Sequence, residues 1–173
     1  VGMVIGTWIL SGTVPTLMYY GFQLVSPSYF LVATCVISAL VSLATGTSWG
    51  TVGTLGLALM GIGEGLGIPM HLTGGALVSG AFFGDKMSPL SETTNLTPAV
   101  CETDLWSHIR SMMATTVPAM LIALVLYVWL GAGYGGQFER STDIATFRQA
   151  LDETFTLSWV TLIPPCVVIG LAL

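Results

Sequence analysis

Two carboxylates, Asp85 and Glu92, lie in a short polar segment between apolar stretches of the chain. The segment runs from Gly84 to Asn95 and reads GDKMSPLSETTN. A carboxylate at membrane depth costs roughly 3 kcal/mol by insertion scales, so it is normally retained for a function. Carboxylate, hydroxyl and carbonyl oxygens are the ligands that hard cations prefer, and the segment offers all three. These residues therefore predict a site for a cation such as sodium.

Neutral oxygens for this site are available in two parts of the sequence. We predict that Asp85 and Glu92 bind the cation and that five other residues supply neutral oxygens: Ser88, Thr93, Asn95, Thr47 and Ser48. The alternative is that Asp85 and Lys86 form a charged interfacial loop and that the hydroxyl residues cap helix ends. The sequence leaves both alternatives open.

The composition places these residues in a membrane protein. Only 8% of the residues are charged and the mean hydropathy is +0.84, whereas an ordinary soluble domain has roughly 25% charged residues. The apolar residues also form blocks long enough to cross the hydrocarbon as helices. The expected partners are therefore the lipid bilayer and small ions.

Charge and cysteine usage exclude several other partners. The net charge is −5 and no two of the four Lys and Arg residues are adjacent, so there is no basic patch for nucleic acid. Cys35, Cys101 and Cys166 are widely spaced and contain no C-x-x-C pair, which argues against a zinc site or a disulfide framework. We expect no cofactor.

Three blocks, two of them apolar and one polar, define the first expected elements. Pro27 to Thr45 is uncharged and follows Ser26, a good N-cap, so it predicts a helix of nearly membrane length. A break rich in glycine and hydroxyl residues, Thr45 to Thr51, separates it from a shorter apolar run, Val52 to Ile62. Two arms with a small polar tip favour a re-entrant hairpin, although two complete spans are the alternative.

The carboxylate segment has its own pattern. An apolar run from Leu72 to Phe83 leads into Gly84 to Asn95, and Leu96 to Val100 is apolar again. A half-length helix, a polar break and a second half-helix are typical of discontinuous transmembrane helices, in which the free helix ends help to bind ions. Pro89 disfavours helical geometry at the residue before it. An aqueous loop is the alternative.

The rest of the chain predicts further spans and close packing. Met112 to Leu130 reads as a span despite Pro118, Gly131 to Glu153 as an extramembrane segment, and Thr156 to Leu173 as the start of another span. Gly80 and Gly84 are four residues apart, a spacing that lets helix backbones approach closely. Because both ends of the chain fall in apolar sequence, we expect residues 1–173 to be a partial membrane transport domain truncated at both ends.

Enzymatic function finds little support in the motifs. The sequence has no H-E-x-x-H, no G-x-S-x-G and no P-loop. An intramembrane hydrolase that uses Asp85 with a second aspartate elsewhere, and a purely structural membrane subunit, are the remaining alternatives to a transporter. We expect no enzyme.

The chain resembles the NhaC-type sodium/proton antiporter family in three runs. They are GTSWGTVGT (Gly46 to Thr54), GIGEGLGIP (Gly61 to Pro69) and GDKMSPLSETTNLTPAV (Gly84 to Val100), the last followed by TDLWSHIR (Thr103 to Arg110). The resemblance covers most of Gly6 to Leu130. Glu92 stands where the family pattern has an aspartate, and Thr97 stands where it has a smaller residue, so the details of the ion geometry can differ.

The resemblance implies an all-α polytopic membrane protein, one part of an inverted-repeat secondary transporter with the hairpin and the discontinuous helix described above. It implies exchange of sodium for protons by alternating access in a cell membrane, the inner membrane of a bacterium. The same family includes sodium- and proton-coupled exchangers of organic acids such as malate and lactate, which is the alternative function. Assembly into a homo-oligomer is left open.

Overall fold

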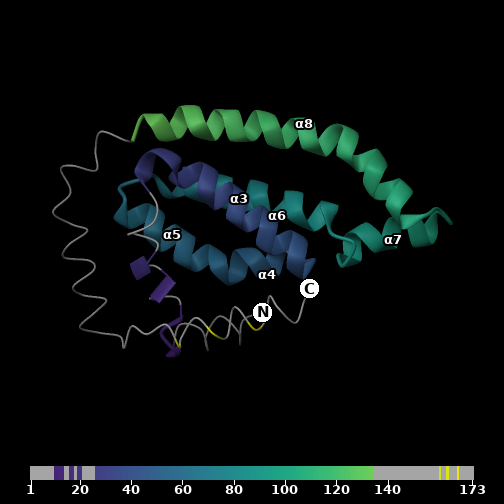
Figure 1. The fold of residues 1–173 in the computed structure, drawn as a ribbon, viewed down its shortest axis with the longest axis horizontal. Helices are drawn as coiled ribbons and strands as arrows, with labels where there is room; N and C mark the ends of the chain where they lie inside the picture. The colour runs from purple at the N-terminus through teal and green to yellow at the C-terminus, as the bar shows by residue number, and fades with distance from the viewer. Residues whose placement is uncertain are drawn as a thin grey trace.

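The first described helix confirms its sequence prediction at both ends. A computed structural model describes residues 10–13, 16–17, 19–20, 26–134, 160, 163 and 167 (Figure 1). Helix α3 spans Pro27–Thr45, with Ser26 as an extended N-cap residue and Pro27 in the first turn. It ends at Gly46, whose φ of 67° is a left-handed conformation that suits glycine. No strand occurs within the described ranges.

The break after α3 is shorter than predicted. Only Gly46 and Thr47 separate α3 from α4 (Ser48–Gly53), which is followed by α5 (Leu55–Gly65) after a single residue, Thr54. The chain reverses at the break, so α4 and α5 return along α3 (Figure 1). Thr47 explains the early restart of the helix, because its side chain accepts a hydrogen bond from the Gly50 backbone and caps α4.

The predicted break at Gly84 to Asn95 is real but covers fewer residues. Helix α6 spans Met70–Met87 and α7 spans Glu92–Val100, which leaves four residues, Ser88 to Ser91, outside both helices. Ser88 is extended (φ −78°, ψ 127°), as expected before Pro89. The prediction of a twelve-residue break was wrong because the last turn of α6 continues to pack on α3 and remains helical.

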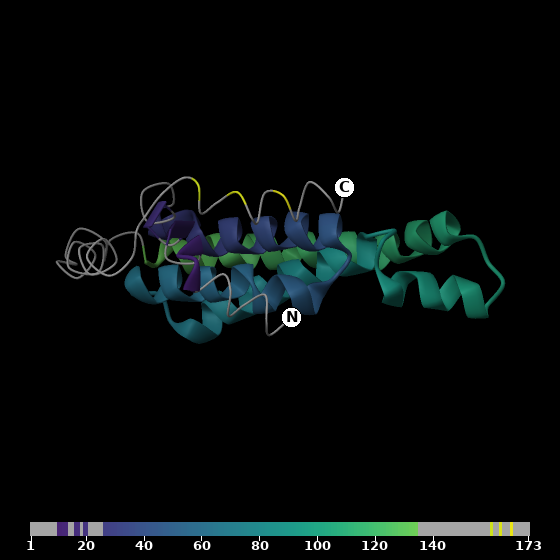
Figure 2. The ribbon, with the colours of Figure 1, turned by 90° about the horizontal axis from the view of Figure 1, so that it is seen from below.

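Helix α8 spans Leu105–Ala132 and contains the whole of the predicted span from Met112 to Leu130, with Pro118 inside it. It runs back along α6 and α3 (Figure 1). Figure 2 shows α7 and the first turns of α8 projecting beyond the end of α3. Both α3 and α8 are long and apolar enough to cross a membrane. The predicted segments Gly131 to Glu153 and Thr156 to Leu173 lie almost wholly outside the described residues.

The packing of α3 against α6 confirms the prediction for the glycine pair. The two helices run in the same direction (Figure 1), with Gly80 against Cys35 and Ala39, and Gly84 against Ala39 and Leu43. A Cβ at either glycine would overlap a backbone carbonyl of α3. The apolar core lies on the side of this contact nearer to the starts of α3 and α6 and consists of Phe30, Leu31, Cys35, Leu59, Ile62, Leu66, Ile68, Ala76 and Leu77.

Candidate ion-binding site

A buried carboxylate–hydroxyl contact lies where the two breaks of the chain meet. Asp85, in the last turn of α6, is only 8% exposed. Its Oδ2 accepts a hydrogen bond of 3.0 Å from the hydroxyl of Ser48, the first residue of α4. Ser48 is also buried. These two side chains, 37 residues apart in sequence, are therefore in direct contact in a largely apolar molecule.

The backbones of the two breaks pack together and hold this contact. A Cβ on Gly46 would lie 2.7 Å from the backbone carbon of Leu90, in the second break. One turn before the first break, Ser42 donates a hydrogen bond of 2.6 Å to the carbonyl of Ala81 on α6. The end of α3 and the end of α6 are thus joined on both sides of the Asp85–Ser48 contact.

The break between α6 and α7 is ordered by side chains of α7. The buried hydroxyl of Thr94 lies 3.2 Å from the carbonyl oxygens of both Asp85 and Lys86, so it satisfies free carbonyls at the end of α6. The amide nitrogen of Asn95 donates to the carbonyls of Pro89 and Ser91, at 2.7 Å each. The polar side chains of α7 therefore fix the shape of the interruption.

The two predicted carboxylates differ in their helix positions. Asp85 is in the last turn of α6, where the partial negative charge of the helix end disfavours an anion and favours a cation. Glu92 is in the first turn of α7, where a carboxylate stabilises the helix. Helix stability accounts for the position of Glu92 but not for that of Asp85.

The other predicted ligands have separate environments. Ser88 is fully buried, and its hydroxyl accepts a hydrogen bond of 3.2 Å from the Leu90 backbone. Thr93 is exposed and shares a hydrogen bond with Ser91, and Glu92 and Thr47 are exposed too. The structure therefore brings Asp85, Ser48 and Ser88 into one buried region, with Asn95 half-buried beside the break.

Two contributors to the site were not singled out from the sequence. Thr94 and Ser42 both bond to backbone carbonyls of α6, and neither stands out from the many hydroxyl residues around it. The signal that could have found Thr94 is its place in the first turn of a helix that follows a proline-containing break, where free carbonyls need donors.

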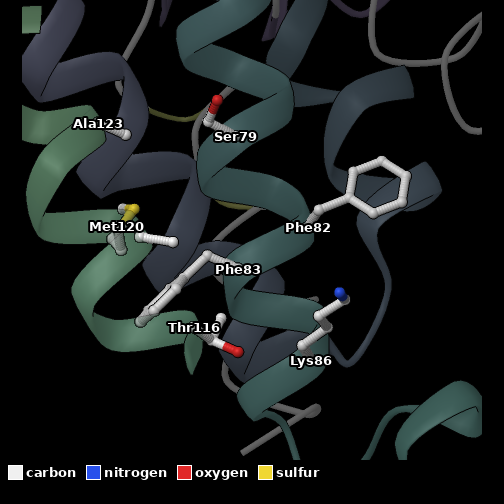
Figure 3. A pocket seen from close by; sticks show the side chains of 8 residues that line it. Ser79, Phe82, Phe83, Lys86, Thr116, Met120 and Ala123 are labelled. Atoms are coloured by element: carbon white, nitrogen blue, oxygen red, sulfur yellow. The ribbon is translucent and has the colours of Figure 1, made fainter. Parts of the chain in front are cut away.

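A groove between α6 and α8 shows which part of α8 lies beside the end of α6. The groove is about 250 Å³ and is lined by Ser79, Phe82, Phe83, Lys86, Thr116, Ala119, Met120 and Ala123. Figure 3 shows Lys86 and Thr116 at the same end of it. Thr116 is one turn inside the apolar span that starts at Met112, or about 6 Å at 1.5 Å per residue. Lys86, the residue after Asp85, therefore lies beside the part of α8 that is near Met112.

Membrane-length helices with a buried carboxylate where two helix breaks meet are typical of membrane transport proteins. The sequence profile described as the Na+/H+ antiporter family matches residues 80–173, so the chain belongs to that family. The chain is therefore located in a cell membrane. No solved structure matches the chain.

Relatives in the family carry three different descriptions. The chain is 48% identical over 173 residues to the Na(+)/H(+) antiporter NhaC of Alkalihalophilus pseudofirmus, covering 100% of the chain and 37% of that protein. It is 47% identical over 171 residues to the malate-2H(+)/Na(+)-lactate antiporter of Bacillus subtilis, covering 99% and 36%. It is 43% identical over 173 residues to the arginine/ornithine antiporter ArcD of Halobacterium salinarum, again covering 99% and 36%. The chain thus spans little more than a third of the length of these relatives.

Proposed function

We propose that the full-length protein exchanges sodium ions for protons across the membrane, and that Asp85 is the carboxylate at which the two ions compete. The observation that carries the proposal is the buried contact between Asp85 and Ser48 at the meeting point of the two breaks. A buried carboxylate with a hydroxyl beside it offers a hard monovalent cation two oxygens, and it offers a proton a single acceptor. The names of two relatives, both NhaC, support the choice of ions.

Competition at one carboxylate is enough to couple the two ions. Sodium and a proton cannot both occupy Asp85, so each leaves the site when the other arrives. If the empty charged site changes sides slowly, because an unpaired carboxylate is costly inside the membrane, exchange is the fast process. Alternating access then moves the site between the two faces of the membrane.

The remaining ligands complete the proposed coordination. Ser48 and Ser88 supply buried hydroxyl oxygens, and carbonyls at the free end of α6 supply backbone oxygens. Asn95 uses its amide nitrogen to hold the break, which leaves its side-chain oxygen for an ion. Glu92, Thr93 and Thr47 are exposed at the edges of the two breaks, where they would meet the ion before Asp85 does.

We further propose that α3, α4 and α5 form a re-entrant hairpin and that α6 and α7 form one discontinuous transmembrane helix. The 11 residues of α5 are too few for a span, and α6 and α7 continue in one direction across the four-residue break. Residues 1–173 would then be part of one half of an inverted-repeat transporter.

Exchange of organic acids is a second candidate function. The malate/lactate and the arginine/ornithine antiporters are as similar to this chain as the NhaC proteins are. The carboxylate of such a substrate would seek hydroxyl groups and free helix N-termini, which the start of α4 and the start of α7 both provide.

The test is transport by the full-length protein in sealed vesicles. Proton flux driven by a sodium gradient is measured for the unchanged protein, for Asp85→Asn and for Glu92→Gln. We expect Asp85→Asn to abolish the flux, and undiminished flux in this variant would sink the proposal. Sodium-dependent uptake of labelled malate, lactate or arginine in the same vesicles would favour the second candidate.

A further inference from the structure

Three fully buried hydroxyl groups in the described helices have no hydrogen-bond partner. They belong to Thr34 and Ser38 on α3 and to Thr73 on α6, and all three side chains are 0% exposed. A buried hydroxyl without a partner costs about 1–3 kcal/mol. Three such groups among the small number of buried polar residues indicate that they have a partner in the working protein.

Neighbouring hydroxyl groups show that the helices themselves could have supplied that partner. Thr45, Thr51 and Thr54 each donate to the carbonyl four residues earlier in the chain, at 2.7 to 2.9 Å. Thr34 and Ser38 lie within α3 and have such a carbonyl available, but do not bond to it. Their hydroxyls are therefore free to bond to a ligand, as is the hydroxyl of Thr73.

The two unpaired hydroxyls on α3 lie on the same side of the helix as Ser42, which is next to the Asp85 site. Thr34, Ser38 and Ser42 follow one another at intervals of four residues, so they occupy one face of α3 over about 12 Å. Ser42 is at the site end of this line, since its hydroxyl bonds to Ala81 and a Cβ on Gly84 would contact its Cβ.

Thr73 lies at the other end of the line. Because α3 and α6 run in parallel, with Gly80 opposite Cys35, Thr73 is level with Phe30, and a Cβ on Gly63 of α5 would contact both side chains. The backbone of Ser28, half a turn further, packs on Gly131 at the end of α8. Thr73, Thr34, Ser38 and Ser42, here called the hydroxyl row, thus lead from the Asp85 region to the end of the bundle remote from Met112.

We propose that the hydroxyl row is the polar route by which water and sodium pass between Asp85 and the membrane face at the Ser28 end. The inference rests on the proposed ion exchange at Asp85. Lys86, next to Asp85, lies beside Thr116 near the start of the apolar part of α8, so the longer part of the crossing is on the side where the row lies. Water in a buried polar space makes about three hydrogen bonds, which the unpaired hydroxyls supply.

The first experiment removes two hydroxyls of the row without adding volume. The double variant Thr34→Val, Ser38→Ala of the full-length protein is compared with Thr45→Val, which loses a hydroxyl on the same helix that is already bonded to Val41. We expect the double variant to lower sodium-driven proton flux about tenfold, or about 1.4 kcal/mol in barrier height. Thr45→Val should keep normal flux.

A purely structural origin of the unpaired hydroxyls predicts another result. Removing unpaired polar groups from a core would then raise the melting temperature and leave flux unchanged. That pair of results overturns the proposal.

The second experiment detects the route without measuring transport. Ser38→Cys is prepared with Cys101 and Cys166 replaced by serine, so that Cys35, which lies about one turn away and is buried against Met120 of α8, is the internal control. We expect the small water-soluble reagent methanethiosulfonate ethylammonium to label the introduced thiol faster than the thiol of Cys35, and sodium to slow the labelling. Equal rates at the two positions overturn the route.

The two proposals fail in different ways. If Asp85→Asn abolishes exchange while the double variant transports normally, the route is wrong and the site stands. If Asp85→Asn exchanges at the full rate, the site is wrong, and the route falls with it.

Discussion

Asp85 and Glu92 are the same kind of side chain on either side of one four-residue break, yet their surroundings differ. Asp85 is buried at the end of α6 and accepts a hydrogen bond from Ser48, whereas Glu92 is exposed at the start of α7. The helix end opposes the charge of Asp85 and favours that of Glu92. A carboxylate kept where it weakens the fold is the better indicator of function than one kept where it strengthens the fold.

The largest expected effect separates the two carboxylates by transport. Asp85→Asn removes a charged ligand, which is worth up to about 3 kcal/mol or roughly 100-fold in sodium affinity. Glu92→Gln removes an exposed charge worth no more than about 1 kcal/mol, or about fivefold. Direct binding of sodium to the purified full-length variants measures both effects. Equal losses in the two variants would remove the distinction drawn above.

A smaller effect is expected at the hydroxyl that contacts Asp85. Ser48→Ala removes the donor and one candidate ligand, so the half-saturating sodium concentration should rise about tenfold, the value of one hydrogen bond to a charged group. Ser111→Ala, on the exposed face of α8, is the matched control and should change nothing. If Ser48→Ala behaves like Ser111→Ala, Ser48 only packs against the site.

The glycine beside Asp85 provides a test through stability. In Gly84→Ala the new methyl group would overlap the backbone of α3 at Ala39, and overpacking of this kind costs about 1–3 kcal/mol. In Gly74→Ala, on the same helix, the nearest atom lies at 3.8 Å and the methyl group fits. The melting temperature in detergent should therefore fall in Gly84→Ala and stay unchanged in Gly74→Ala. A comparable loss at Gly74 would contradict the packing described for α6.

The smallest expected effect is on stability. It tests whether each helix end stabilises or destabilises the carboxylate that it carries. Glu92→Gln should lower the stability of the folded protein by about 0.3–1 kcal/mol, because α7 loses a favourable charge in its first turn. Asp85→Asn should leave stability unchanged or raise it, because a buried anion is removed from the unfavourable end of α6. The melting temperatures of the two variants at low ionic strength measure both effects. A loss in Asp85→Asn would mean that its carboxylate serves the fold.

Local signals made part of this fold predictable. Ser26 and Pro27 mark the start of α3, Gly46 marks its end, and Pro89 marks the interruption after α6. The length of the interruption was not predictable, because the last turn of α6 packs on the backbone of α3 at Gly84. Such a contact depends on which two helices pair, which a single sequence does not specify.

The candidate site, like the fold, was predictable from the sequence only in part. The carboxylates and their surrounding oxygens could be chosen from residue type and spacing alone. Their unequal burial could not, because it depends on which face of which half-helix each carboxylate occupies in the folded chain. The role of Thr94 depends likewise on the end of α6 lying next to α7.

The close approach of α3 and α6 limits the motions available to the transporter. Where glycines place one helix backbone directly on another, the two helices have no room to slide or rotate against each other without a clash. Ser42 bonded to Ala81 and Gly46 packed on Leu90 fasten the same pair at the other end of the contact. Asp85 and Ser48 therefore move together within one rigid body, and the hinges that change their exposure lie outside it.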